Sequence, residues 1–231
     1  MERFWLLDPV PDTTGARAKW EPPEDGRVFR EIRNGSEAPG AVEDGSAWTV
    51  AHVERALPPG GAEEYRKARK DGTREFDLWA DPYRAQRVAR VVTQPGGGRV
   101  AAYEVFGGPA GEQLALITRQ KAFTRGRIRA RWSVQQTGQR AATGVKGRVF
   151  WHCVWWLLLP FWVFIAFGSP DVPRIPVRTR FRREGQRALD WRSDGLDVPS
   201  DGWDPRVLAA LVALMSSHAG FVKDSWDDYR V

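Results

Sequence analysis

Three histidines and one cysteine are the side chains best suited to nucleophilic or metal chemistry, and their spacing favours neither. His152 and Cys153 are adjacent, whereas His52 and His218 lie far from them along the chain. Neighbouring residues point to different sides of a helix or strand, so His152 cannot activate the Cys153 thiol. A single cysteine also excludes a disulfide framework and a cysteine-built zinc site. We therefore interpret Cys153 as an apolar filler.

Other catalytic and cofactor-binding patterns are missing from the sequence. It contains no Walker loop, GxSxG or HExxH motif. Five aspartates near the carboxyl terminus carry oxygen ligands of the kind that Ca²⁺ prefers: Asp201, Asp204, Asp224, Asp227 and Asp228. They lack the spacing of an EF-hand, so we interpret residues 221–231 as a solvated acidic tail. The sequence predicts a protein that is not an enzyme and needs no cofactor or metal.

The strongest functional pattern is an uncharged stretch of 20 residues. Residues 149–168 read VFWHCVWWLLLPFWVFIAFG, and they hold four of the 12 tryptophans of the chain. About 20 apolar residues suffice for a helix to cross a bilayer, and tryptophan is enriched at the membrane interface. We predict that this apolar insert contacts a membrane through Trp151, Trp155, Trp156, Leu158, Phe161, Trp162 and Phe164.

The path of the apolar insert stays open at this point. Pro160 lies near its centre, where proline kinks or breaks a helix. A full span and a shallow re-entrant hairpin are therefore both compatible with the sequence. A third possibility is a pair of buried strands, 149–159 and 161–167, in the core of a soluble domain, since strands buried on both faces are continuously apolar.

Basic charge flanks the apolar insert on both sides. The chain has 35 Lys and Arg against 29 Asp and Glu, but residues 113–150 hold nine basic side chains and no acidic one. Anionic head groups attract such residues beside an apolar segment, by about 1 kcal/mol each. The predicted contacts with anionic lipid are Arg125, Arg127, Arg129, Arg131, Lys146, Arg148, Arg174 and Arg178. Nucleic acid is a less favoured partner, because the charges bracket an apolar segment.

The basic residues also have a purely structural interpretation. In the sequence GRIRARWSV, Ile128, Ala130 and Trp132 alternate with arginines. This alternation predicts a half-buried strand whose arginines form its solvated outer face.

The first 86 residues are expected to contain little of the main domain. Turn-rich motifs such as EPPEDG and RNGSEAPG predict a loosely ordered arm over residues 1–47. Within residues 48–86 we predict two short helices, at 49–57 and 62–70. Acidic residues at the start of the second helix and basic ones at its end agree with the helix dipole.

From residue 87 onward the sequence predicts a meander of short antiparallel strands followed by a buried helix. Alternating apolar residues recur between turn signals, as in a β-barrel or sandwich. Residues 205–217, PRVLAALVALMSS, are apolar on all sides, which is typical of an enclosed helix, and Asp204 provides its N-cap. The predicted fold class is mainly β (α+β): an antiparallel barrel around a buried hydrophobic helix.

This order of elements resembles the tubby C-terminal-like fold, which includes the tubby, phospholipid scramblase and LURP-one-related proteins. The stretches that carry the resemblance are YEVFGGPAGEQLALITR, RARWSVQQTGQ, ALDWRSDG and DPRVLAALVALMSSH, within about residues 87–220. In that group a barrel of antiparallel strands encloses a hydrophobic helix, and members act on or near membranes and lipids. The apolar insert departs from the soluble members, and no ligand residue can be carried over.

Together these patterns predict a membrane-associated barrel domain that contacts anionic lipid. The alternative is a soluble protein-interaction module whose apolar insert is core or covers a protein partner. No signal peptide is expected in MERFWLLDPVPD, which predicts that the bulk of the protein is cytoplasmic. High usage of Arg, Ala and Gly suggests a GC-rich bacterial coding sequence.

Overall fold

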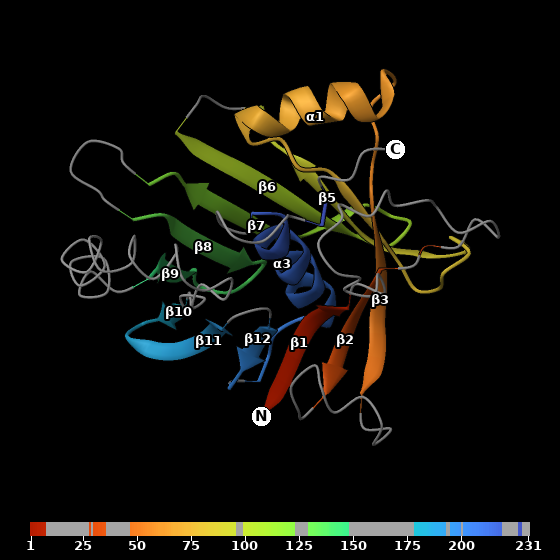
Figure 1. Ribbon diagram of the computed structural model, residues 1–231. Coiled ribbons are helices and arrows are strands. Elements are labelled where there is room, and N and C mark those ends of the chain that lie inside the picture. The colour runs from red at the N-terminus through yellow and green to blue at the C-terminus, as the bar shows by residue number, and fades with distance from the viewer. Residues whose placement is uncertain are drawn as a thin grey trace, which may run out of the picture.

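Twelve antiparallel strands form a closed barrel around one helix in the computed structural model, and a second helix lies outside it (Figure 1). The structure describes residues 1–7, 28, 30–35, 47–95, 99–122, 129–147, 178–192, 195–199, 201–218 and 226–227. The strands are β1 (Glu2–Leu7), β2 (Glu31–Gly35), β3 (Trp48–Arg55), β4 (Phe76–Trp79), β5 (Arg87–Thr93), β6 (Val100–Gly107), β7 (Glu112–Gln120), β8 (Arg131–Gln136), β9 (Ala142–Lys146), β10 (Arg178–Arg183), β11 (Gln186–Arg192) and β12 (Gly195–Val198). The described helices are α1 (Gly61–Asp71) and α3 (Pro205–Ser217).

The barrel is a meander that its first strand closes. Each strand pairs with its neighbours in sequence, and β1 pairs with both β2 and β12. Phe4 of β1 lies opposite Leu196 on one side and opposite Asn34 on the other. Among the described strands, the closed ladder leaves no edge exposed to pair with another chain.

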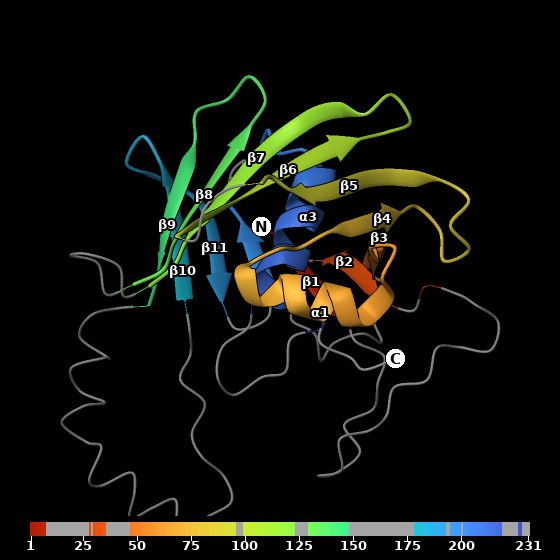
Figure 2. The ribbon, with the colours of Figure 1, turned by 90° about the horizontal axis from the view of Figure 1, so that it is seen from above.

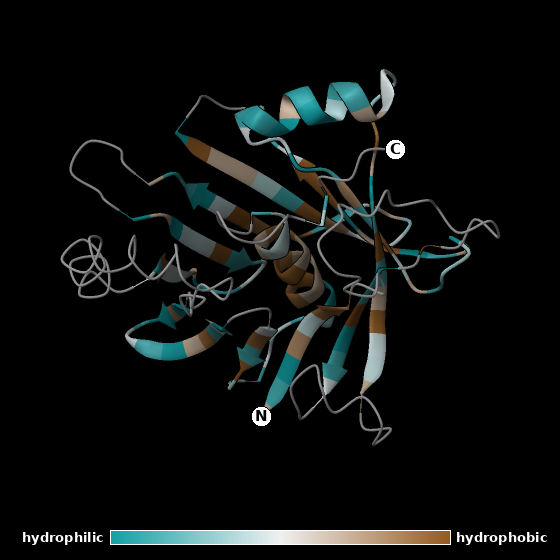
Figure 3. Ribbon diagram, viewed as in Figure 1, coloured by the Kyte–Doolittle hydropathy of each residue, from teal (hydrophilic) through white to brown (hydrophobic). Residues whose placement is uncertain are grey.

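Helix α3 fills the barrel interior (Figure 2). Ten of its 13 residues are buried, and it contacts strands on several sides of the barrel, including β1, β3, β5 and β7. A barrel of 12 strands is wider than the eight-stranded barrels whose own side chains fill the centre, so an additional element is needed inside. Figure 3 shows the apolar colouring of α3 and of parts of the strands around it, and buried residues of both form one core.

The predicted enclosed helix and most predicted strands are confirmed. Helix α3 covers residues 205–217, and the side chain of Asp204 accepts a hydrogen bond from the Arg206 backbone N–H at 2.8 Å. The strands expected from residue 87 onward are present as β5, β6, β7, β8, β10 and β11. Trp132 and Trp191 lie in the core, with exposed fractions of 2% and 7%.

The prediction of a loosely ordered, helical N-terminal region is wrong in its main part. The barrel begins at residue 2, not at residue 87, because β1 to β4 supply four of its strands. Residues 49–57 do not form a helix: Trp48–Arg55 is β3, hydrogen-bonded to β2 and β4. Thr49, Val50 and Val53 are β-branched and favour a pleated strand when partners lie on both sides.

The second expected helix, 62–70, is confirmed as α1. Glu63 and Glu64 lie in its first turn and Arg69 and Lys70 in its last, as the dipole favours. It ends at Gly72, whose φ of 104° lies in the left-handed region that glycine adopts without strain.

The apolar insert 149–168 falls outside the described residues, between β9 and β10. In the part of the chain that the structure describes, no helix is long and apolar enough to cross a membrane. The membrane contact of the insert therefore stays a prediction.

The contribution of the α3 N-cap to stability can be tested by replacing Asp204. We expect Asp204→Ala to lower the free energy of unfolding by about 1 kcal/mol, because the part-buried Arg206 backbone N–H loses its acceptor. Urea unfolding followed by tryptophan fluorescence measures the change. Asp204→Ser is the matched control, since serine keeps an acceptor oxygen. An equal loss in both variants would assign the effect to the Arg206 ion pair instead.

Candidate functional site

The two ends of the barrel differ sharply in chemistry. At the amino end of α3, the backbone N–H of Asp204 donates to Gln136 Oε1 at 2.9 Å, beside the β8–β9 turn. At the opposite end, which we call the carboxyl end, α3 finishes at His218. The β7–β8 and β9–β10 connections leave the barrel at the carboxyl end, because Trp132, at the start of β8, contacts His218.

His218 is held at the carboxyl end by a tyrosine and a tryptophan. Its Nε2 lies 2.9 Å from the Tyr103 hydroxyl, which donates to the Gly72 carbonyl oxygen at 2.8 Å. The Trp132 ring meets the imidazole edge-on, with centroids 5.6 Å apart. The single hydroxyl proton of Tyr103 goes to the carbonyl oxygen, so His218 must carry a proton on Nε2 to complete the contact.

The environment of His218 keeps the imidazole neutral. Burial, and then the positive charges of Arg74, Arg119, Arg69 and Lys146, hold the pKa of His218 well below its usual 6.5. Burial likewise raises the pKa of Tyr103 to about 12. Both groups are therefore uncharged at neutral pH, and neither is poised as a nucleophile.

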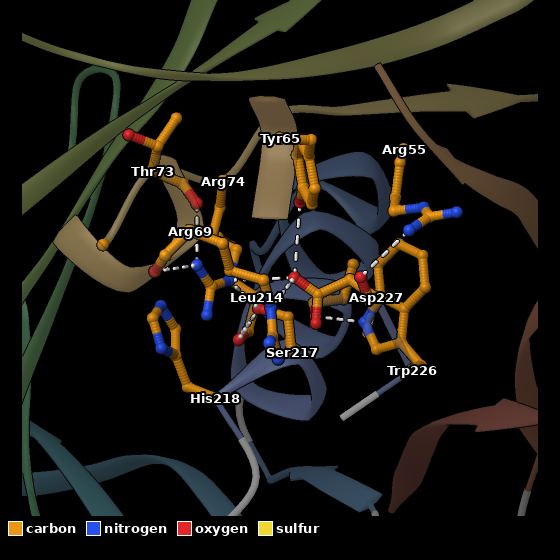
Figure 4. Close-up of polar contacts among 12 residues, drawn as sticks. Arg55, Tyr65, Arg69, Thr73, Arg74, Leu214, Ser217, His218, Trp226 and Asp227 are labelled. Atoms are coloured by element: carbon orange, nitrogen blue, oxygen red, sulfur yellow. Dashed lines mark hydrogen bonds and ion pairs between the residues drawn. The ribbon is translucent and has the colours of Figure 1, made fainter. Parts of the chain in front are cut away.

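Asp227 is the carboxylate at the centre of the polar network in Figure 4. Its side chain is buried and lies 3.0 Å from the guanidinium groups of both Arg69 and Arg74. The Tyr65 hydroxyl donates to the same carboxylate at 3.3 Å. Arg74 also donates to Ser217 Oγ at 3.2 Å, so the network joins α1, α3 and the segment 226–227. Removing one partner from a buried ion pair leaves an uncompensated charge.

Residues 226–227 are bound to the barrel by more than this ion pair. The Trp226 ring packs on Phe76 with centroids 4.7 Å apart, and its indole N–H donates to the Ala213 carbonyl oxygen at 2.8 Å. Arg55 donates to the Asp227 carbonyl oxygen at 3.3 Å. The prediction of a solvated acidic tail is therefore wrong for Asp227, because its buried carboxylate is matched by the part-buried guanidinium of Arg69 and the buried guanidinium of Arg74.

Two further cations at the carboxyl end have no carboxylate partner among the described residues. Arg119 lies 5.8 Å from the centroid of the Trp132 ring, and Lys146 faces the barrel interior opposite Thr179. Burial, reinforced by Arg119, lowers the pKa of Lys146. We call Arg69, Arg74, Arg119, Lys146, His218 and Asp227 the carboxyl-end cluster. It holds four cationic side chains, one neutral imidazole and one carboxylate.

The structure places four of the eight predicted lipid contacts. Arg131 is exposed on the outer face of β8, and Arg129 donates to the Gly147 carbonyl oxygen at 2.9 Å. Lys146 points inward, and Arg178 donates to Asp190 at 2.8 Å. The remaining predicted residues lie outside the described part of the chain: Arg125, Arg127, Arg148, Arg174, Trp151, Trp155, Trp156, Leu158, Phe161, Trp162 and Phe164.

Arg178 belongs to an ion network on the outer face of the barrel. The buried carboxylate of Asp190 also contacts Arg187 and Arg192. Burial alone would raise the pKa of Asp190, but the hydrogen bond from Arg178 and the nearby positive charges hold it below its usual value. Arg178 thus has a structural partner, while about a third of its side chain stays exposed.

Sequence reasoning missed Tyr103, Arg74 and Asp227 as members of one site. They lie far apart in the sequence and share no motif, and the closed barrel brings them together. The described residues contain no group of three or more His, Cys, Asp or Glu side chains placed to hold a metal ion. The site offers fixed positive charge, a neutral imidazole and aromatic rings, which suit binding more than bond breaking.

The fold and the carboxyl end define a helix-filled antiparallel barrel with a cation-rich end. Comparison of the chain with protein-family models, curated proteins and solved structures gives no match to any of them. The resemblance to the tubby C-terminal-like fold therefore stays a prediction about the family, whereas the barrel around a helix is an observation.

Removal of the buried Asp227 carboxylate should destabilise the fold measurably. We expect Asp227→Ala to lower the free energy of unfolding by about 3–5 kcal/mol, because Arg69 and Arg74 are left buried without their counter-charge. Chemical denaturation measures the loss. Asp201→Ala, at an exposed aspartate, is the control and should change little. Equal stability of the two variants would contradict the assigned role.

The buried imidazole of His218 makes the free energy of unfolding depend on pH. Its folded-state pKa is lowered, so the unfolded chain binds more protons below about pH 6.5. Stability due to neutral His218 is complete above that pH. It falls towards lower pH by up to about 1.4 kcal/mol per unit.

His218→Gln tests this dependence, because glutamine still donates to Tyr103 but does not titrate. We expect wild-type stability to fall more steeply than that of the variant between pH 6.5 and the lowered pKa. Urea titrations at a series of pH values give both slopes. Parallel slopes would show that other groups cause the acid sensitivity.

Proposed function

We propose that this protein is a non-enzymatic, membrane-associated barrel domain that meets anionic lipid with the carboxyl end of its barrel. The observation that supports it is the position of Gly147 and Arg178, the described residues nearest to the apolar insert on either side. The Gly147 backbone N–H donates to the Arg178 carbonyl oxygen at 2.9 Å, and Lys146 pairs with Thr179. The intervening chain therefore leaves and re-enters the barrel at one point.

Basic residues surround that point. Arg129, at the end of the β7–β8 connection, donates to the carbonyl oxygen of Gly147. Arg131 is exposed two residues further on, at the start of β8. A bilayer that accepted the apolar insert would bring its anionic head groups within reach of these side chains.

The common exit and entry point favours a re-entrant path over a single crossing. If residues 149–168 crossed a bilayer once, residues 169–177 would have to return through it. Nine fully extended residues reach about 30 Å, no more than the hydrocarbon thickness. They would also carry Asp171, Arg174 and unpaired backbone groups through the hydrocarbon. A shallow hairpin with both ends on the cytoplasmic face meets neither difficulty.

Replacing residues 148–177 with Asn-Gly tests the proposal. Gly147 and Arg178 are already hydrogen-bonded, so a two-residue type I′ turn should close the β9–β10 hairpin without strain elsewhere. We expect the variant to keep its thermal midpoint within a few degrees and to lose binding to vesicles of phosphatidylglycerol and phosphatidylcholine. Co-sedimentation at low and high salt measures binding.

The full chain should sediment with anionic vesicles and stay bound after a high-salt wash, because salt screens exposed charges but not apolar insertion. Two outcomes contradict the proposal. Unfolding of the Asn-Gly variant would mean that the apolar insert is core, as the soluble interaction module requires. Undiminished vesicle binding by that variant would place the membrane contact elsewhere.

A further inference from the structure

The carboxyl-end cluster carries more positive charge than the described residues neutralise. The single carboxylate of the cluster, Asp227, contacts Arg69, Arg74 and Tyr65 through its Oδ2 atom. Arg119 and Lys146 remain without a carboxylate among the residues that the structure describes, and both are half-buried. Like charges that are partly withdrawn from water repel one another strongly, so such a pair is stable when an anion lies between or beside its members.

A buried hydroxyl adds a second, independent sign of a ligand. Thr179 is fully buried, and its Oγ1 finds no hydrogen-bond partner in the structure. It faces the barrel interior directly across the β9–β10 ladder from Lys146. Buried hydroxyl groups are nearly always hydrogen-bonded, and this one belongs to the strand residue paired with Lys146.

The strand register explains how these groups come to one place. Arg119 pairs with Trp132 and Trp132 with Gly144, all on the inner face. Lys146 lies one inward position nearer the carboxyl end, where its backbone N–H donates to the Ala130 carbonyl oxygen at 3.0 Å. The Trp132 ring is covered on one side by His218, so the two cations lie at the margin of an apolar, poorly hydrated surface.

We propose that the carboxyl end of the barrel interior is an oxyanion site, in which the Lys146 ammonium, the Arg119 guanidinium and the Thr179 hydroxyl bind a phosphate group. Ammonium and guanidinium groups form charge-assisted hydrogen bonds with phosphate oxygens, and a threonine hydroxyl adds one more donor. His218 is neutral, so it adds no repulsion or attraction of its own. The site goes beyond membrane association and does not depend on it, because free phosphate and a phospholipid head group share this chemistry.

Thermal unfolding of the full chain with inorganic phosphate tests the site directly. At a phosphate concentration about 100 times the dissociation constant, the midpoint should rise by roughly 5–10 °C. Sodium chloride at matched ionic strength should leave it unchanged. Isothermal titration calorimetry with inorganic phosphate gives the dissociation constant for each variant.

Lys146→Met and Arg119→Met should each weaken phosphate binding by roughly 10–100-fold, and Thr179→Val by a smaller factor. The matched controls are Lys67→Met, an exposed lysine on α1, and Arg140→Met, an exposed arginine at the other end of the barrel. Both controls should bind phosphate as the wild type does. Without phosphate, Lys146→Met should unfold at an equal or higher temperature, because it removes an uncompensated charge.

Three results would overturn the proposal. One is the absence of any phosphate-specific midpoint shift in the wild type. Another is an unchanged affinity in Lys146→Met and Arg119→Met. The third is a marked loss of midpoint in Lys146→Met without phosphate, which would mean that a carboxylate of this chain already occupies the site.

A second arm separates the two sources of phosphate. Dihexanoyl phosphatidic acid, used below its micelle concentration, should compete with inorganic phosphate if the site accepts a lipid head group. Binding of phosphate without such competition would restrict the site to small soluble anions. Either result is independent of vesicle binding by the apolar insert, so failure of the membrane proposal and failure of this site are distinguishable.

Discussion

Enclosure of α3 is the constraint on which the rest of the structure depends. Val207, Val212 and Ala213 are fully buried and point to different sides of the helix. Full burial of a valine or leucine side chain contributes about 1.5–3 kcal/mol, and an open sheet could cover only one side of the helix. The sheet must therefore close, and it closes where β1 meets β12. This makes six residues at the start of the chain, Glu2–Leu7, essential to a core formed largely by its later part.

Features with a local cause could be predicted from the sequence, and features with a distant cause could not. Residues 205–217 carry their own composition and cap, and β5 to β8 show their alternation over six to nine residues. By contrast β4 and β12 have four residues each, too few to establish a period. Residues 49–57 are compatible with a helix taken alone, but pairing with β2 and β4 decides the conformation.

The carboxyl-end cluster shows the same limit more sharply. Counting charges located the positive surplus of residues 113–150 but not the face on which each side chain lies. Lys146 was expected to contact anionic lipid, and its pairing with Thr179 turns it towards the barrel interior. Arg74 and Asp227 meet only because the barrel and the segment 226–227 bring α1 and the end of α3 together. No sequence pattern around Arg74 or around Asp227 predicts that contact.

The positive charges inside the carboxyl end of the barrel exceed the negative charges beside them. The last turn of α3 carries about half a negative charge, and Asp227 carries one more. Together they do not balance Arg69, Arg74, Arg119 and Lys146. An apolar residue at position 146 would face the barrel interior without this repulsion, whereas the charge of Lys146 is stabilised by a negative potential nearby. An anionic bilayer at this end and a phosphate group inside it would supply that potential from the same side. Both proposals therefore place the anion in the region where the basic β7–β8 and β9–β10 connections leave the barrel.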